Sequence, residues 1–292
     1  MTETSPTTTP ASLTVAAIQM VSQADVPTNL CAAESLVAEA ACRGAQLVLL
    51  PENFAVFNAQ ALREWAEKDL QGALSGQVAG WAQRHGVWIV AGTLPQISRY
   101  PETQGQVSEG RVRTSSLIFD PQGRQQGRYD KIHLFDVDVA DAHGAYRESE
   151  TIEPGTEPVC MTMDFGGGLI AKTGLSVCYD LRFPELYRHL SRQGANILTV
   201  PAAFTWETGR AHWEPLLRAR AIENQCFVIA ANQGGQHSST RRTWGHSMII
   251  DPWGSVLASQ DDGEGVVLAI LDFAEQQLLH RRMPVQSHRV LD

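Results

Sequence analysis

Short apolar runs and helical spacings of apolar residues alternate along most of this chain. Apolar runs lie at residues 13–19, 47–50 and 87–92, and again at 169–177, 197–200 and 227–231. Between the first two runs, apolar residues recur at helical spacing until Gly44 ends the helix. The pattern predicts β-α-β-α-β twice, with largely parallel strands and helices on the outside.

One segment occurs in similar form in both halves. Residues 43–54 (RGAQLVLLPENF) resemble residues 193–204 (QGANILTVPAAF). Gly44 and Gly194 lie 150 positions apart, and so do the two prolines. This spacing is too long for a solenoid repeat and indicates two halves of one domain, each with its own sheet. Two such sheets stacked face to face would form a four-layer α-β-β-α sandwich; the pattern alone is equally compatible with one long sheet.

The rest of the chain completes one α/β domain. Further strands are expected at residues 114–119, 127–131, 245–250 and 265–271. We expect the domain to span residues 12–284, with a disordered N-terminal tail at 1–11 and a C-terminal tail at 285–292. Residues 97–113 are polar and rich in Gly, Gln and Ser, as a mobile loop would be, and the sequence leaves open whether they close a pocket.

Composition narrows the class of protein. A hydrophobic fraction of 43% and a charged fraction of 19% are typical of a soluble globular chain. The net charge of −9 argues against binding to nucleic acid or to an anionic membrane, and no apolar run is long enough to span a bilayer. The five cysteines show no paired spacing, and residues 1–11 lack the features of a signal peptide. We therefore expect a cytoplasmic location and buried roles for the cysteines other than Cys178.

Three ionisable residues follow predicted strands. Glu52 comes after residues 47–50, Lys131 ends the strand at 127–131, and Cys178 comes after 169–177. Ligands of open α/β sheets bind beyond the carboxyl ends of strands, so these residues are expected to share a site. Cys178 stands at a turn before a helix that Pro184 begins, where backbone N–H groups can stabilise a thiolate.

These residue types permit nucleophilic catalysis at an amide or nitrile carbon. A thiol is mostly protonated at neutral pH and needs a base, which Glu52 can supply. Lys131 and the backbone N–H of Tyr179 can stabilise the oxyanion that forms when Cys178 attacks a carbonyl. The expected intermediate is a thioester, formed after ammonia leaves, which Glu52 then helps water to hydrolyse.

The segments around these residues resemble the carbon–nitrogen hydrolases of the nitrilase superfamily. The matching stretches, in order, are PENF at 51–54, YDKIH at 129–133 and VCYDLRFPE at 177–185. The resemblance implies the four-layer sandwich and the Glu–Lys–Cys roles already given. It also implies a second glutamate, Glu148, that holds Lys131 and contacts the departing nitrogen, and a homodimer or larger homo-oligomer.

Within that superfamily the chain is most similar to the deaminated glutathione amidases. The supporting stretches are residues 133–139, 201–213, 218–226 and 236–254. The resemblance implies release of ammonia from a small acidic amide, the α-keto product of glutathione transamination, as metabolite repair. Because that substrate is anionic, Arg182 is expected to grip a carboxylate, and Phe204 and Thr208 are expected to line the same cleft.

No cofactor or metal is expected. His133, His212 and His246 match no metal-ligand spacing and are interpreted as structural. Three alternatives stay open. The enzyme could be an ω-amidase acting on α-ketoglutaramate, or another short-chain aliphatic amidase. The chain could instead be a catalytically inactive scaffold of the same fold, or a redox protein that uses Cys178 with another cysteine.

Overall fold

The first half of the chain, together with one strand from near the C-terminus, forms a seven-stranded sheet. The computed structural model describes residues 12–99, 105–139 and 144–291, so the predicted tail at 1–11 lies outside the described residues. The strands are β1 (Ser12–Gln19), β2 (Leu47–Leu49), β3 (Trp88–Val90), β4 (Leu94–Gln96), β5 (Arg113–Phe119), β6 (Gln125–Asp130) and β17 (Gly265–Asp272). Their order is β17-β1-β2-β3-β5-β4, with β6 beside β5. As predicted, β1, β2 and β3 are parallel.

The second half forms a six-stranded sheet. Its strands are β9 (Cys160–Asp164), β10 (Ile170–Leu175), β11 (Ile197–Ala202), β12 (Phe227–Asn232), β15 (Ser247–Ile250) and β16 (Val256–Gln260). The order is β16-β15-β12-β11-β10-β9, and β10, β11 and β12 are parallel, as in the other half. Two small hairpins lie outside the sheets: β7 (Asp136–Asp138) with β8 (Ala145–Arg147), and β13 (Gly234–Gln236) with β14 (Arg242–Trp244).

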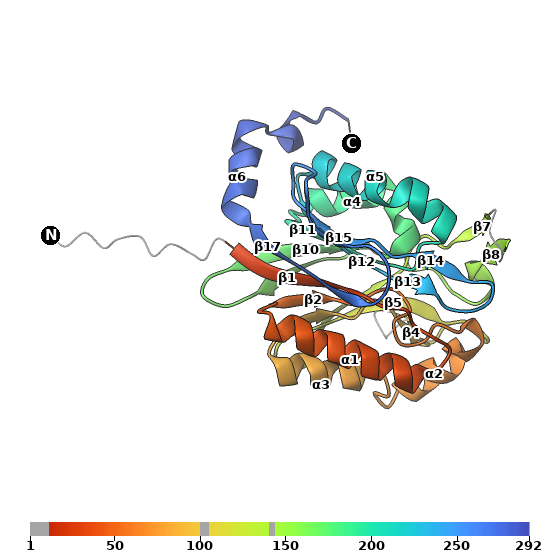
Figure 1. The fold of residues 1–292 in the computed structure, drawn as a ribbon. Helices are drawn as coiled ribbons and strands as arrows, with labels where there is room; N and C mark the ends of the chain where they lie inside the picture. Colours follow the sequence, from red (N-terminus) through yellow and green to blue (C-terminus); the bar gives the residue numbers. More distant parts are fainter. Residues whose placement is uncertain (1–11, 100–104, 140–143, 292) are drawn as a thin grey trace.

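Helices cover the outer face of each sheet. The α-helices are α1 (Val26–Cys42), α2 (Leu62–Asp69), α3 (Ser75–His85), α4 (Pro184–Arg192), α5 (Trp206–Asn224) and α6 (Phe273–Arg282). Short 3-10 helices are η1 (Ala59–Ala61), η3 (Glu148–Glu150), η4 (Cys178–Arg182) and η5 (Val285–His288). In Figure 1, α1 and α3 lie below the first sheet, and α4 and α5 lie above the second. The predicted four-layer α-β-β-α sandwich is confirmed.

Both faces of the central strands are buried, which explains their continuous apolar runs. On β1, Leu13 and Val15 belong to the core between the two sheets. Ala16 and Ile18, which point the opposite way, pack in a second core with Val37 and other residues of α1. Each fully buried Leu, Ile or Val side chain contributes about 1.5–3 kcal/mol to folding, so this burial fixes the register of the strand.

The repeat seen in the sequence has the same backbone geometry in both halves. Gly44 has φ of 89° and Gly194 has φ of 88°, a conformation that disfavours any residue with a β-carbon. Each glycine follows a helix and leads into a parallel strand. The two halves therefore present the ends of β2 and β11 in matching positions.

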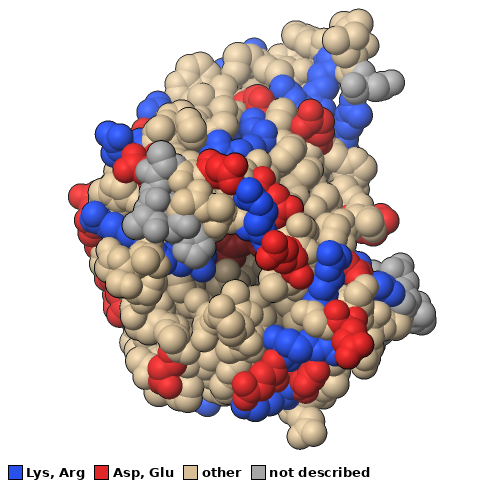
Figure 2. Space-filling view, turned by 90° about the vertical axis from the view of Figure 1, so that its right-hand side faces the viewer, with Lys and Arg blue, Asp and Glu red and all other residues tan. Residues whose placement is uncertain are grey.

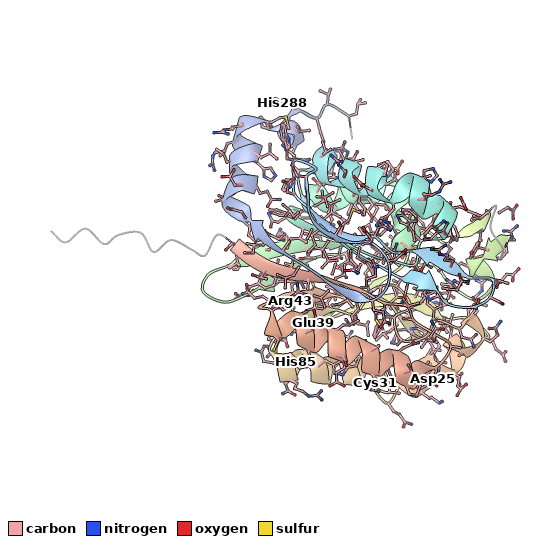
Figure 3. All side chains as sticks on the ribbon, viewed as in Figure 1. Asp25, Cys31, Glu39, Arg43, His85 and His288 are labelled. Carbon is pink, nitrogen blue, oxygen red and sulfur yellow. The ribbon has the colours of Figure 1, made fainter. Side chains whose placement is uncertain are left out.

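The prediction that the other four cysteines are buried is wrong for two of them. Cys31 and Cys42 are exposed on α1, Cys160 is half-buried and Cys226 is buried. Cys31 lies on the outer side of α1 in Figure 3. The buried positions of α1 are Val26, Leu30, Ala33, Val37 and Ala40, along with Asn29. Cys31 and Cys42 fall on the other side of that stripe.

The folded part continues past the expected boundary at residue 284. Residues 285–288 form η5, and the amide of Gln286 donates to the carbonyl of Asn224 at 3.0 Å. In the described part of the loop at 97–113, Ile97, Val107 and Val112 are buried in a small separate core that also contains Ala66 and Ile152. Within the described ranges, no helix combines the length and apolar character needed to cross a bilayer.

Candidate active site

Four predicted site residues meet around one cavity of about 660 Å³. Glu52 follows β2, Lys131 follows β6, Glu148 begins η3, and Cys178 begins η4 beyond the end of β10. Glu52, Lys131 and Cys178 are buried, with exposed fractions of 3%, 2% and 8%. The strand ends thus bring together side chains that are up to 126 positions apart in the sequence.

Lys131 lies between two carboxylates. Its Nζ donates to Glu52 Oε1 at 2.8 Å and to both carboxylate oxygens of Glu148 at 2.9 Å. Burial by itself would lower the pKa of Lys131, but the charges of Glu148 and Glu52 raise it well above its ordinary value. Burial raises the pKa of Glu148 against the effect of Lys131. Lys131 therefore stays an ammonium ion, and it is a fixed positive charge beside the thiol.

Cys178 has a constrained backbone and a protonated thiol. Its φ of 48° lies in the left-handed region, which is uncommon for a residue with a β-carbon. Burial, and after it the negative charge of Glu52, raise the pKa of the Cys178 thiol well above its ordinary value, although Lys131 opposes them. A thiol in this state needs a base before it can act as a nucleophile. Glu52 lines the same cavity, and its negative charge is close enough to contribute to the raised pKa of the thiol.

Glu52 is held by both halves of the molecule. One carboxylate oxygen faces Lys131, and the other accepts the backbone N–H of Ala203 at 2.9 Å. Ala203 directly follows Ala202, the residue that occupies the position of Glu52 in the second half. The duplicate strand end thus supplies a backbone donor where the first half supplies the carboxylate.

Asp180 is a site residue that the sequence reasoning missed. Its carboxylate has no exposed surface and accepts four hydrogen bonds. Oδ2 accepts from the N–H of Val177 at 2.8 Å and from the hydroxyl of Tyr129 at 2.7 Å. Oδ1 accepts from the N–H of His133 at 3.1 Å and from its Nδ1 at 2.7 Å. Asp180 therefore ties the turn that carries Cys178 to the segment that carries Lys131.

The predicted substrate contacts are only partly in the cavity wall. Tyr179, Phe204 and Thr208 line the cavity, whereas Arg182 is not among its lining residues. The guanidinium of Arg182 lies over the rings of Tyr179 and Phe204, at 5.8 and 5.5 Å, and shares a contact of 3.3 Å with His212 Nδ1. The N–H of Tyr179 lies in the first turn of η4, where no intrahelical partner is available. The substrate roles of these residues stay predictions.

Two further arginines, Arg147 and Arg241, do line the cavity. Sequence reasoning missed both because Arg147 lies in a small hairpin and Arg241 in a turn, with no apolar run to mark the place. Figure 2 looks onto this end of the molecule and shows a hollow with acidic and basic side chains around it.

The histidines singled out in the sequence make local contacts. His133 bonds to Asp180, as described, and its ring stacks on Phe183 at 3.7 Å. Nδ1 of His246 bonds to the carbonyl of Trp244 at 2.8 Å. Among the residues that the structure describes, no group of three or more His, Cys, Asp or Glu side chains is arranged to hold a metal ion.

Comparison with known sequences decides the family. A sequence model described as carbon-nitrogen hydrolase matches residues 14–281. The chain belongs to the carbon–nitrogen hydrolase family. This carbon–nitrogen hydrolase is 45% identical to a protein of Yersinia enterocolitica named deaminated glutathione amidase. The match covers 94% of this chain and 92% of that protein.

Solved structures agree with this assignment. The Caenorhabditis elegans NitFhit protein superposes with a TM-score of 0.84 at 35% identity, over 96% of this chain and 65% of that one. An amidase of the nitrilase superfamily from Nesterenkonia superposes with a TM-score of 0.74 at 26% identity, over 92% of this chain and 99% of that one. A mutant of that amidase was solved with acrylamide added at its active-site cysteine. The predicted membership of the nitrilase superfamily is confirmed.

Proposed function

We propose that this carbon–nitrogen hydrolase is a thiol amidase that acts through Cys178. The observation that carries the proposal is the meeting of a thiol, Glu52 and Lys131 in one buried cavity. As sulfur attacks the amide carbon, Glu52 takes the thiol proton. Lys131 and the N–H of Tyr179 stabilise the oxyanion. Because all these groups are fixed before substrate arrives, little reorganisation opposes the developing charge.

In the remaining steps of the cycle, Glu52 passes on the proton that it took from the thiol. Collapse of the tetrahedral intermediate breaks the C–N bond, and protonated Glu52 gives its proton to the departing nitrogen. A thioester on Cys178 remains. Glu52 then removes a proton from water, which attacks the thioester, and the sulfur leaves and recovers the proton as a thiol. Glu148 keeps Lys131 charged and oriented through both steps.

The proposed substrate is deaminated glutathione, with a role in metabolite repair. The name of the Yersinia relative supports this choice at 45% identity over nearly the whole chain. One part of the sequence-based expectation needs correction on chemical grounds. Deaminated glutathione has already lost its amino group, and its remaining γ-amide nitrogen belongs to cysteinylglycine. Hydrolysis at that bond releases the dipeptide amine and 2-oxoglutarate, and ammonia would be released only from a primary amide such as α-ketoglutaramate.

Product analysis tests the proposal. Purified enzyme is supplied separately with deaminated glutathione, α-ketoglutaramate, glutamine and a simple nitrile, and kcat/KM is measured for each. We expect the highest kcat/KM for deaminated glutathione, with equal amounts of 2-oxoglutarate and cysteinylglycine. A higher value for α-ketoglutaramate, with ammonia as the product, would identify an ω-amidase instead. Absence of turnover with all four, in protein that melts cooperatively, would favour the inactive scaffold.

Two further expectations accompany the proposed activity. The resemblance to the nitrilase superfamily leads us to expect a homodimer or larger homo-oligomer, which sedimentation equilibrium measures directly. The five cysteines without paired spacing lead us to expect a cytoplasmic enzyme, which cell fractionation tests.

A further inference from the structure

Three described cationic residues line the cavity, and two of them are already neutralised. Lys131 is paired with Glu52 and Glu148. The guanidinium of Arg147 donates to Asp138 at 2.6 Å and to two backbone carbonyls. The guanidinium of Arg241 has neither an ion pair nor a hydrogen bond with the described residues. An unpaired guanidinium in a cavity wall is suited to receive an anionic group from a ligand.

Arg241 is nevertheless held in place. It ends the turn between β13 and β14, where its N–H donates to Ser238 Oγ at 3.1 Å and its carbonyl accepts from the N–H of His237 at 3.0 Å. Its guanidinium lies over the ring of Phe57, 4.2 Å from the ring centre. This cation–π contact orients the group and leaves its N–H donors in the guanidinium plane available.

The neighbouring His237 supports this arrangement as a neutral ring. It stacks on Phe57 at 4.1 Å, and its nitrogens bond to the carbonyl of Ser22 at 2.8 Å and to Thr243 Oγ1 at 2.6 Å. Because a carbonyl only accepts, Nδ1 carries the hydrogen and Nε2 accepts from Thr243. Burial, with a contribution from the charge of Arg241, lowers the pKa of His237 to about 4. At neutral pH, His237 is therefore uncharged, and the positive charge beside the Phe57 ring is that of Arg241.

The position of Arg241 suits a group several bonds from the reacting carbonyl. The base of the hairpin lies against the cavity wall, because the N–H of Trp244 donates to the carbonyl of Phe204 at 2.9 Å. Arg241 precedes Trp244 by three residues, a separation of roughly 10 Å in an extended strand. In deaminated glutathione, the leaving group is two residues long and ends in a carboxylate, about 7 Å from the scissile bond when extended.

We propose that Arg241 binds the terminal carboxylate of the leaving group and so makes the enzyme selective for amides of an acidic peptide-like amine. This inference rests on the proposed function. It assigns the leaving-group side to Arg241, and it predicts that a different residue recognises the acyl-side carboxylate. A charge-assisted pair of this kind corresponds to a change in binding of about 10- to 100-fold.

Three substrates separate the two carboxylates: deaminated glutathione, its C-terminal carboxamide, and α-ketoglutaramate, which has only the acyl-side carboxylate. Arg241→Ala should lower kcat/KM for deaminated glutathione by about 10- to 100-fold, mainly through KM. The same variant should stay within about twofold of wild type on the other two. Arg241→Lys should recover part of the loss, because it restores the charge but not the bidentate geometry.

Arg242→Ala is the matched control. Arg242 is exposed, lies outside the cavity lining and stacks on Trp206 at 3.3 Å. It should leave all three values unchanged. Equal losses on all three substrates in Arg241→Ala, or a preference for the free carboxylate that survives in it, would overturn the role of Arg241 while the amidase function stands. If wild type hydrolyses neither deaminated glutathione nor its carboxamide, the proposed function itself fails and the inference fails with it.

Discussion

The buried carboxylate of Asp180 offers a demanding test of how the nucleophile is positioned. Asp180→Asn keeps the shape of the side chain and replaces one acceptor oxygen with an NH2 group. Each carboxylate oxygen accepts one backbone N–H, from Val177 on one side and from His133 on the other. The tyrosine hydroxyl and the imidazole can each exchange donor for acceptor roles, but a backbone N–H cannot. Whichever way the amide is turned, one backbone N–H faces a donor.

The expected cost follows from these contacts. The variant loses charge-assisted hydrogen bonds, worth about 1.5–3 kcal/mol each, and leaves one buried N–H unpaired, at about 1–3 kcal/mol. We expect the free energy of unfolding to fall by roughly 3–5 kcal/mol. Because the Val177 N–H fixes the turn that holds Cys178 at positive φ, kcat/KM should fall as well, by about 100-fold or more for a displacement near 1 Å.

Urea unfolding followed by fluorescence gives the change in stability, and steady-state assays at a temperature well below the transition give the change in rate. Tyr129→Phe is the matched control. It removes one hydrogen bond to the same carboxylate and leaves the Val177 N–H paired, so its losses should be clearly smaller. If Asp180→Asn unfolds within about 0.5 kcal/mol of wild type and keeps full activity, the proposed positioning by Asp180 is wrong.

The remaining predictions concern the base, acid stability and the acyl-side contact. Glu52→Gln cannot accept the thiol proton and should lower kcat/KM about 100- to 10,000-fold in steady-state assays; activity near wild type would exclude Glu52 as the base. The hydrogen bond from Arg99, assisted by Arg113 and opposed by burial, lowers the pKa of Glu153 to about 2. Its stabilisation is therefore complete above about pH 4.5 and is lost as the pH falls toward 2, by about 1–3 kcal/mol in acid unfolding curves. In Glu153→Gln, the free energy of unfolding should depend less steeply on pH between about 4.5 and 2. An unchanged pH dependence would contradict this role of Glu153. Arg182→Leu should raise KM for acidic amides more than for neutral ones, and equal effects would remove Arg182 from carboxylate binding.

Much of the fold could be predicted because local pattern and burial agree. The paired glycines Gly44 and Gly194 marked equivalent turns, and the strands after them are parallel in both sheets. Glu52 and Cys178 could be placed in one site because strand ends gather at one edge. The helical spacing of apolar residues in α1 already indicated that Cys31 is exposed. The error there came from treating cysteine as a buried residue type before considering its place on the helix.

The site residues that could not be predicted from the sequence are placed by contacts between distant segments of the chain. Asp180 meets Tyr129, 51 positions away, and nothing in either local segment indicates that pairing. Arg241 reaches the cavity only because its hairpin packs on Phe204 and its guanidinium rests on Phe57. The positions of such side chains depend on how the two halves pack together. The pattern of apolar residues predicts that the halves pack, but it does not predict which individual polar side chains then meet.

The most direct test of the account is to look for the acyl group on sulfur. Enzyme mixed briefly with deaminated glutathione, quenched in acid and digested, should yield the peptide around residue 178 with a thioester-linked 2-oxoglutaryl group. A Cys31→Ser variant, which lacks an exposed thiol remote from the cavity, should give the same result. Sustained turnover with an unmodified peptide in every quenched sample, together with undiminished activity of Cys178→Ala, would contradict it.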